Sequence, residues 1–542
     1  MKKLLSLTLA LVVALSCAVI TAQAAVDDDH LILQCSWWNG EMFACRWRNV
    51  GGFDANLVLR ALILLKADGS AEFDRCDLAS EYVKSDDGLT YSITLRDDIL
   101  WHDGTPMTIE DVAWSVKTFL KYPIGYAIIK SSFQKIVGAE DYANGLTDEL
   151  EGMTVEGNTI TFTLMEPVSS FEFALGEFKP LPKHLLEGED PTAINNASYW
   201  QQPVGNGPFA ITEVQPGNYA IYEYFEDYYG AEPQIKKIRV LLESTAVNST
   251  ASHAAELASL DDLDYFITSD LATIELMRDY PHYSEYVNEN VIYFRYLLVN
   301  MVGRPDEEYN EAMSDIRVRQ AILYALDLEL LIEQFYGEVA SMNVTGVASH
   351  RDFFNSDVEG YSYDPEKAKE LLEEANWDYD YPLTIITRYS DQTTKDFLDA
   401  VQYYLEQVGF NCNWYIGEGS SQVVIYENRD FDLYYGAIAG LTINETYSMY
   451  AAGLIPTLIG VDEHWVDLYN SLVVSTSQEE WTEKILEMQE YEMNESLVRL
   501  PLYTRNKEFN YVNTYRLTLP EGIQFGVNEL NYDTHFEDWV LN

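Results

Sequence analysis

Basic residues are scarce in this chain, and their scarcity excludes one group of partners. The 542 residues include 34 Lys and Arg against 88 Asp and Glu, which gives a formal net charge of −54. A body so acidic repels polyanions, so we expect neither nucleic acid nor an anionic membrane surface as a partner. The acidic excess could attract cationic ligands. We interpret it instead as a device for solubility, because runs such as Asp-Asp-Asp at 27–29 are typical of solvated faces.

Cysteine and histidine are too few and too scattered to predict a metal site. Five cysteines are present, and no two have the C-x-x-C spacing of a zinc ribbon. The eight histidines form no H-x-H or H-x-x-x-H pair, which leaves nickel or haem binding as a weaker alternative. We expect no metal and no cofactor. Disulfide pairing stays open among Cys35, Cys45, Cys76 and Cys412, although a pair between the first two would close a short loop.

Signatures of common hydrolases are also missing. The chain has no H-E-x-x-H, no G-x-S-x-G and no P-loop pattern. Carboxylate pairs such as Asp432 and Glu445 could support acid–base chemistry, which keeps a secreted glycosidase or peptidase as an alternative. With 88 carboxylates, however, any chosen pair carries little information. We therefore expect a protein that is not an enzyme.

Long apolar runs are confined to the N-terminus. Lys2 and Lys3 precede an apolar run at 4–20, and Ala22-Gln23-Ala24 follows with the small-x-small pattern that signal peptidase cuts. This predicts a signal peptide at 1–24 and an exported protein. Leu15-Ser16-Cys17 resembles a lipoprotein box, so cutting before Cys17 would instead leave a lipid-anchored form. We expect the cut after Ala24.

In the remaining chain, predicted strands and helices alternate, as is typical of a large α/β protein. Its length exceeds what one hydrophobic core usually supports, so at least two domains are expected. Alternating polar and apolar residues predict strands, and apolar residues at helical spacing predict helices. Strands are predicted at 91–95, 159–164 and 411–416, and helices at 315–336, 364–377 and 393–410.

The stretch LRDDILWHDGTPMTIEDVAWSV, residues 95–116, looks chemical because His102 and Asp103 are adjacent and further carboxylates follow. Asp103-Gly104 has turn composition, and Thr108 stands three residues before Asp111, which resembles a capping box. Negative charge in the first helical turn also suits the helix dipole. We therefore predict a structural role for this stretch and for His102, not a catalytic or metal site.

The same region carries a resemblance that extends along nearly the whole chain after the signal. SDDGLTYSITLRDDILWHDGTPMTIEDVAWSVKTFL (85–120) resembles the signature region of the family 5 extracellular solute-binding proteins. These are the peptide, dipeptide and nickel receptors of bacterial ABC importers. Further similar blocks follow in the family's usual order at 138–150, 203–230, 294–301, 314–332, 363–377 and 500–511. Within 203–230, Gly205-x-Gly207-Pro208-Phe209 is a recognisable point.

The resemblance implies a two-lobed periplasmic-binding-protein-like α/β fold of type II, in its large three-subdomain form. Lobe I would comprise 25–290 plus 505–542, with an inserted subdomain at roughly 51–199, and lobe II would comprise 291–504. Two strands crossing between the lobes would form the hinge. Closure would bury the ligand, and the closed form would engage the permease.

The expected ligand depends on one segment of the second lobe. Oligopeptide receptors of this family hold the peptide α-ammonium with an aspartate, in a segment that FDLYYGAIAGLTINETYSMY (431–450) resembles. Here no aspartate follows Gly436, and Glu445 could supply the carboxylate instead. Aromatic residues make up 13% of the chain and could stack on sugars or on peptide side chains. The candidate ligand-binding residues are Trp37, Trp38, Tyr434, Tyr435, Gly436, Glu445 and Tyr447.

We therefore predict an extracytoplasmic solute-binding receptor, expected to be a monomer, that delivers its ligand to an ABC transporter permease. An oligopeptide is the first expected ligand and an oligosaccharide the alternative. A receptor that hands its ligand-bound form to a membrane sensor would have the same sequence features, so transport and signalling stay open.

Overall fold

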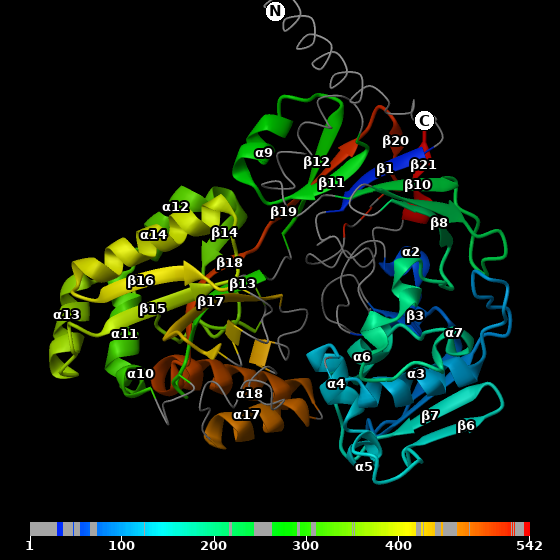
Figure 1. Ribbon diagram of the computed structural model, residues 1–542, viewed down its shortest axis with the longest axis horizontal. Helices are drawn as coiled ribbons and strands as arrows, with labels where there is room; N and C mark the ends of the chain where they lie inside the picture. The colour runs from blue at the N-terminus through cyan, green and yellow to red at the C-terminus, as the bar shows by residue number, and fades with distance from the viewer. Residues whose placement is uncertain are drawn as a thin grey trace, which may run out of the picture.

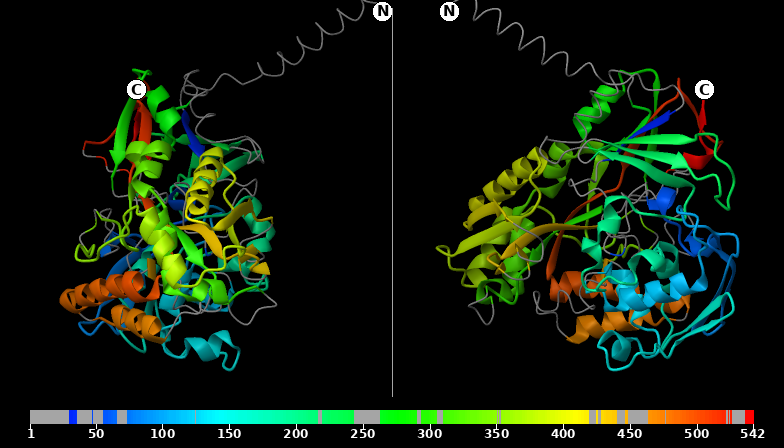
Figure 2. Two further views of the ribbon diagram at one scale, coloured as in Figure 1. Left: turned by 90° about the vertical axis from the view of Figure 1, so that its left-hand side faces the viewer. Right: turned by 45° about the vertical axis from the view of Figure 1, so that its right-hand side comes forward.

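The computed structural model contains two large mixed sheets, each covered by helices, and a smaller third sheet (Figure 1). The structure describes residues 30–35, 47, 55–65, 73–123, 125–215, 219–242, 263–289, 293–304, 310–349, 351, 353–418, 424–425, 428–439, 446–447, 463–475, 477–521, 523, 525 and 536–542. We call the body around the seven-stranded sheet lobe I and the body around the six-stranded sheet lobe II. The 45° view in Figure 2 shows the same division.

The seven-stranded sheet of lobe I has the order β12-β19-β11-β1-β10-β9-β8. At its centre β1 runs parallel to both β10 and β11, while the outer strands pair antiparallel. Helix α9 (Leu271–Met277) follows β11. The strands are β1 (His30–Cys35), β8 (Phe209–Gln215), β9 (Tyr219–Tyr224), β10 (Lys237–Leu242), β11 (Tyr265–Thr268), β12 (Tyr283–Asn288) and β19 (Glu508–Asn513).

A four-stranded antiparallel sheet, in the order β4-β5-β7-β6, extends lobe I. One continuous apolar core joins it to the seven-stranded sheet. Its strands are β4 (Ala79–Lys84), β5 (Thr90–Leu95), β6 (Met153–Glu156) and β7 (Thr159–Thr163), so both strands predicted here are confirmed. The surrounding elements are α2 (Ala55–Val58), β2 (Ile63–Leu65), β3 (Phe73–Cys76), α3 (Ile109–Lys121), α4 (Ala127–Phe133), α5 (Ala139–Ala143), α6 (Phe171–Glu177), α7 (Lys183–Leu186), η1 (Ile194–Asn196) and η2 (Ser198–Gln201).

The six-stranded sheet of lobe II has the order β14-β18-β13-β17-β15-β16. Strand β15 runs parallel to β16 and β17, and β13 runs antiparallel to β17 and β18. The strands are β13 (Tyr293–Val299), β14 (Ala340–Met342), β15 (Pro382–Thr387), β16 (Asn411–Ile416), β17 (Leu433–Ala439) and β18 (Arg499–Arg505). The other elements are α10 (Glu311–Ser314), α11 (Ile316–Ala325), α12 (Leu328–Phe335), η3 (Gly337–Val339), α13 (Pro365–Glu374), α14 (Gln392–Gln407), α17 (Glu463–Val473), α18 (Gln478–Tyr491) and the π-helical turn η5 (Glu492–Ser496).

Local signals in the sequence set most of the helix limits. Asp364 caps α13 by accepting the backbone N–H of Lys367, and α14 is followed by Gly409 with a positive φ of 106°, as its C-terminal position requires. The prediction of a helix at 315–336 is confirmed for its residues but not for its continuity. The helix stops at Leu326, and Asp327 accepts the backbone N–H of Leu330 to begin α12. A capping aspartate thus interrupts an apolar face that reads as continuous.

The chain passes between the two sheets twice. It leaves β12 at Asn288 and enters β13 at Tyr293, and it returns from β18 to β19 through Asn506 and Lys507. The last segment stays in lobe I, where β20 (Leu517–Thr518), η6 (Phe536–Asp538) and β21 (Val540–Leu541) lie beside β1 (Figure 1). These crossings give the two-strand connection expected of the fold. The lobe limits at 24, 51, 199, 290 and 504 stay predictions.

Candidate functional site

The two crossings lie at the same side of each large sheet as the C-terminal ends of β17 and β11. In lobe II, Ala439 at the C-terminal end of β17 pairs with Tyr293, the first residue after the crossing. In lobe I, Thr268 at the C-terminal end of β11 pairs with Phe509, just after the return crossing. Ligands of α/β proteins bind beyond the carboxyl ends of parallel strands. We therefore place the candidate site at these two strand ends and call them the crossing edge.

Several contacts join the lobes around the crossings. Arg505 donates from Nη1 to Ser269 Oγ at 2.8 Å, and Arg278 pairs with Glu338 at 3.0 Å. Val339 of lobe II packs in a small apolar cluster with Ile32, Phe266 and other residues of lobe I. A separate contact lies at α17, where the Val473 carbonyl accepts the Ser169 N–H of lobe I at 3.5 Å.

Three of the predicted ligand-binding residues lie outside the described residues. They are Trp37, Trp38 and Glu445. Their places in the chain are still informative, because Trp37 and Trp38 come directly after β1 ends at Cys35. Since β1 is parallel to β10 and β11, this end points to the carboxyl side of the lobe I sheet. Their role as ligand contacts stays a prediction.

Tyr434, Tyr435 and Gly436 are consecutive residues of strand β17, but they do not all point to the same face of the sheet. Tyr434 and Gly436 share one face, where a Cβ on Gly436 would come within 2.6 Å of the Tyr434 ring. Tyr435 points to the opposite face and is 0% exposed. Its hydroxyl lies 2.6 Å from that of Tyr503, its ring packs against Phe397, and burial raises its pKa well above the usual value. Tyr435 is therefore a core residue of lobe II in this structure.

Tyr447 is held in place by a buried ion pair. Arg499 donates to Glu492 Oε1 from Nε at 2.8 Å, and both side chains are at most 1% exposed. The other oxygen, Glu492 Oε2, accepts the Tyr447 hydroxyl at 2.9 Å, and Arg499 Nη1 donates to the Thr446 carbonyl at 2.9 Å. The ion pair thus fixes the two residues that follow Glu445. Tyr447 itself is enclosed by protein, so it supports this segment from within.

Sequence reasoning missed an arginine at the crossing edge. Arg295 stands two residues into β13, inside the otherwise apolar and aromatic run YFRYLLV. Its guanidinium lies 3.9 Å from the ring centroid of Tyr389 and 4.8 Å from that of Tyr293. Tyr389 follows β15 at the same edge, and the two tyrosine hydroxyls are 3.2 Å apart. A charged residue within an apolar strand is the signal that could have pointed to it.

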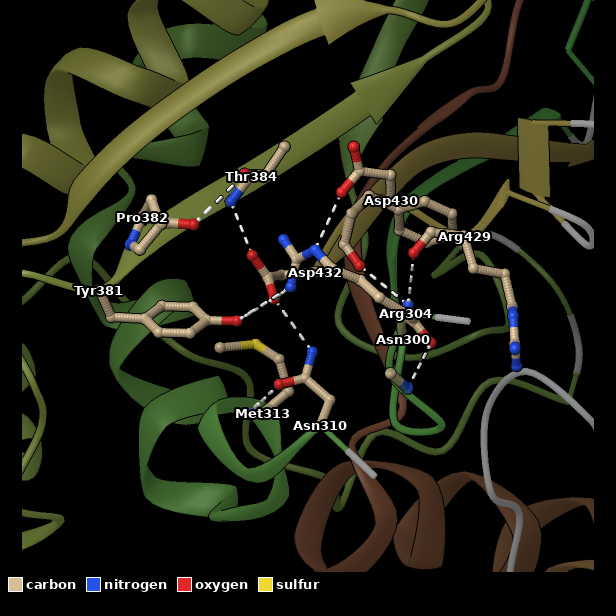
Figure 3. A network of polar contacts seen from close by, with 12 residues as sticks. Asn300, Arg304, Asn310, Met313, Tyr381, Pro382, Thr384, Arg429, Asp430 and Asp432 are labelled. Carbon is tan, nitrogen blue, oxygen red and sulfur yellow. Dashed lines mark hydrogen bonds and ion pairs between the residues drawn. The ribbon is translucent and has the colours of Figure 1, made fainter. Parts of the chain in front are cut away.

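Asp432, one half of the carboxylate pair considered for catalysis, lies at the other end of the lobe II sheet (Figure 3). It is 0% exposed and accepts hydrogen bonds from Tyr381 Oη at 2.6 Å, Asn310 Nδ2 at 3.0 Å and the Thr384 backbone N–H at 2.8 Å. Arg304 adds an ionic contact at 3.5 Å. These donors join the starts of β15 and β17 to the helical layer, which gives Asp432 a structural task.

The stretch around His102 is structural, as predicted. The imidazole accepts the Gly205 N–H at Nδ1, at 3.1 Å, and donates from Nε2 to the Gly207 carbonyl at 2.9 Å. Burial lowers the pKa of His102 to about 4, so the ring is neutral at pH 7. At the start of α3, Asp111 accepts the Thr108 N–H at 2.8 Å, which confirms the capping interaction.

The described ranges contain no group of three or more His, Cys, Asp and Glu side chains that could hold a metal ion. In the same part of the chain, no helix is long and apolar enough to cross a membrane. The two cysteines whose side chains are described, Cys76 and Cys412, are free thiols.

Comparison with known proteins decides the family. Residues 75–454 match the model of the bacterial extracellular solute-binding proteins, family 5. The chain belongs to this family. Family 5 consists of solute-binding receptors, and the blocks from which the resemblance was predicted fall largely within the matched range.

Individual relatives of this family 5 member point the same way. It is 28% identical over 340 residues to a Brucella ovis protein named as an ABC transporter peptide-binding protein. That match covers 62% of this chain and only 59% of the relative. It is 26% identical over 315 residues to the dipeptide-binding protein of Escherichia coli, covering 55% of this chain and 54% of that protein.

Solved structures show the fold. The oligopeptide-binding protein AppA of Bacillus subtilis, in complex with a nonapeptide, has a TM-score of 0.76 at 18% identity, covering 95% of this chain and 99% of that one. NikZ of Campylobacter jejuni, in complex with Ni(L-His), has a TM-score of 0.74 at 20% identity, with 95% and 100% coverage. The two-lobed α/β architecture is thereby confirmed.

Proposed function

We propose that this family 5 protein is an extracytoplasmic receptor that captures an oligopeptide between its lobes and delivers it to an ABC transporter permease. Membership of the family carries the proposal, together with the names of the relatives, which are peptide and dipeptide receptors. The chain acts as a monomer and catalyses no reaction. Its only chemical task is to bind and release.

Binding would work by closure of the two lobes. The ligand enters at the crossing edge, and contacts from both lobes form only when the sheets approach one another. A ligand shifts the equilibrium between open and closed forms only by its difference in affinity for them. The two short crossings would serve as the hinge of such a rotation.

Each lobe contributes a different kind of group. Trp37 and Trp38, directly after β1, supply flat apolar surfaces from lobe I. Glu445 takes the place of the aspartate that peptide receptors use for the α-ammonium, and the Arg499–Glu492 pair holds its neighbours Thr446 and Tyr447 in position. Tyr434, a half-buried ring near the start of β17, is kept as a further proposed ligand contact.

We further propose that the chain is exported and cut after Ala24, while a cut before Cys17 would leave it tethered to the membrane by a lipid. Mass spectrometry of the mature N-terminus distinguishes the two. A mature chain that begins at Ala25 with a free amino group supports the first cut. A mature chain that begins at a diacylated Cys17 supports the second.

Thermal-shift measurement of the mature protein tests the function. The probes are a mixture of tri- to hexapeptides, a set of oligosaccharides, and nickel with histidine. A ligand at about 100 times its dissociation constant adds roughly 2.7 kcal/mol to the free energy of unfolding, which is an easily measured shift. We expect a shift with peptides that is lost in Glu445→Gln and retained in the control Glu418→Gln. A shift with oligosaccharides alone would contradict the peptide proposal and favour an aromatic sugar platform.

A further inference from the structure

Within the part of the chain that the structure describes, Arg295 differs from the other buried arginines of lobe II, Arg319 and Arg499, because no polar group pairs with it. Arg499 is paired with Glu492, and Arg319 donates to the carbonyls of Ser314 at 2.9 Å and Ser496 at 3.1 Å. Arg295 is only 8% exposed, yet its Nε and Nη1 have no hydrogen-bond acceptor. Among the described residues it forms no ion pair with any carboxylate.

Three tyrosine rings of the described residues lie around the guanidinium. Besides Tyr389 and Tyr293, Tyr435 lies 5.3 Å away by its ring centroid. Each cation–π contact stabilises a desolvated cation by about 0.5–2 kcal/mol. Taking an ionised group out of water costs several kcal/mol, so rings offset this cost only in part. An anion that formed hydrogen bonds to the guanidinium would therefore gain free energy from a cation already stripped of water.

The position of Arg295 places this cation at the mouth of the candidate site. Tyr293 is the first described residue after the crossing and lies on the same face of β13, since side chains alternate along a strand. Tyr293 and Tyr389 are both half-buried, their hydroxyls are 3.2 Å apart, and both rings contact the guanidinium. A small anion arriving at the crossing edge would therefore find two hydroxyl donors close to the guanidinium.

We propose that Arg295 is an anion subsite of the ligand site and that it binds a carboxylate of the ligand. The proposal rests on the proposed entry of the ligand at the crossing edge. Arginine presents two parallel N–H groups to a carboxylate, and the Tyr293 and Tyr389 hydroxyls complete the set of donors. A chain with a net charge of −54 repels anions in general, so a ligand carboxylate needs a local cation of this kind.

The subsite lies on one face of the lobe II sheet. Arg295 is on the Tyr435 face, and the rings of Tyr293 and Tyr389 contact its guanidinium there. The carboxylate could be a peptide C-terminus or an acidic side chain, and the experiment below separates these sources.

The test compares carboxylates with matched neutral forms. The probes are Ala-Ala-Ala, its C-terminal amide, the amide of Ala-Asp-Ala, and succinate, each titrated by calorimetry and thermal shift against the mature protein. Arg295→Met removes the cation and keeps an apolar side chain of similar length. It should fold, because a buried cation without a counter-ion is replaced by an apolar group. Arg295→Lys keeps the charge without the paired geometry. Arg317→Met, at an exposed arginine paired with Asp315, controls for the change in net charge.

We expect the wild type to prefer at least one carboxylate probe over its neutral match. Arg295→Met should lose that preference, weakening the carboxylate form about 10- to 150-fold while the amide binds unchanged. Arg295→Lys should be intermediate and Arg317→Met should match the wild type. Preference for Ala-Ala-Ala identifies the C-terminus, and preference for the Ala-Asp-Ala amide identifies a side chain.

Two results would overturn the subsite: a wild type that prefers none of the carboxylate probes, or an Arg295→Met variant that keeps the full preference. Failure of the peptide proposal has a different signature. If none of the three peptides binds but succinate does, and succinate binding is lost in Arg295→Met, the anion subsite stands and the ligand is a different carboxylate.

Discussion

The burial of the Arg499–Glu492 ion pair allows us to predict how much stability is lost when the pair is broken. Replacing Glu492 with leucine removes the carboxylate that pairs with Arg499 and leaves a guanidinium at 0% exposure without this counter-charge. Breaking a buried pair in this way costs about 3–5 kcal/mol. The Tyr447 hydroxyl and the Gly346 N–H also lose their acceptor, which places the expected cost at the upper end.

Differential scanning calorimetry measures this cost. For a lobe of about 200 residues, each kcal/mol lowers the melting temperature by roughly 2–4 °C, so Glu492→Leu should lower the lobe II transition by roughly 6–20 °C. Lobe I should melt as before, because the pair lies wholly within lobe II. The double variant Glu492→Leu with Arg499→Met should recover most of the loss, since neither charge of the pair is then left buried without the other. A single variant that melts within 2 °C of the wild type would refute the reasoning.

Three further changes test the structural reading of lobe I. Gly205→Ala should prevent folding of lobe I or cost several kcal/mol, because its Cβ would lie 1.8 Å from the Val58 carbonyl oxygen; near-wild-type urea unfolding would contradict this packing. His102→Gln should leave ligand affinity unchanged but alter the pH dependence of stability. The folded pKa of His102 is about 4 against about 6.5 when unfolded, so the neutral ring contributes fully above pH 6.5 and loses up to about 3 kcal/mol as the pH falls to 4. Urea unfolding of wild type and variant across pH 4–7 checks this, and parallel curves would exclude it. Asp111→Ala should cost about 2 kcal/mol by the same assay, because the N–H groups of Thr108 and Lys183 lose their acceptor, and Asp111→Asn should cost less.

Elements that depend on near neighbours in the chain could be predicted. The strand at 91–95 alternates because one face is buried, and the Asp364-Pro365 start of α13 needs only its own first turn. The break between α11 and α12 was missed because apolar periodicity continues through Leu326 and Asp327. A capping side chain decided the break, and periodicity does not record it.

The candidate site was harder to predict because its parts come from distant segments. Tyr434, Tyr435 and Gly436 were treated as one group, but the pleat of β17 sends Tyr435 to the interior and its neighbours to the other face. Asp432 and Glu445 form a candidate pair in the sequence, yet Asp432 lies at the far end of the sheet, where its hydrogen-bond donors are Asn310, Tyr381 and Thr384. Proximity in sequence says little about which strand end a side chain reaches.

The sequence by itself determined the family, the α/β texture, the acidic surface and the structural role of His102, because ordered motifs and local capping patterns encode them. Only the tertiary structure decided that Arg295 contacts the rings of Tyr293 and Tyr389 and that Glu492 binds Arg499 and Tyr447. The rings and charges in these groups come from strands and loops up to about a hundred residues apart, brought together by sheet register. Their energies depend on burial and on the loss of water, and neither exists until the lobes have folded.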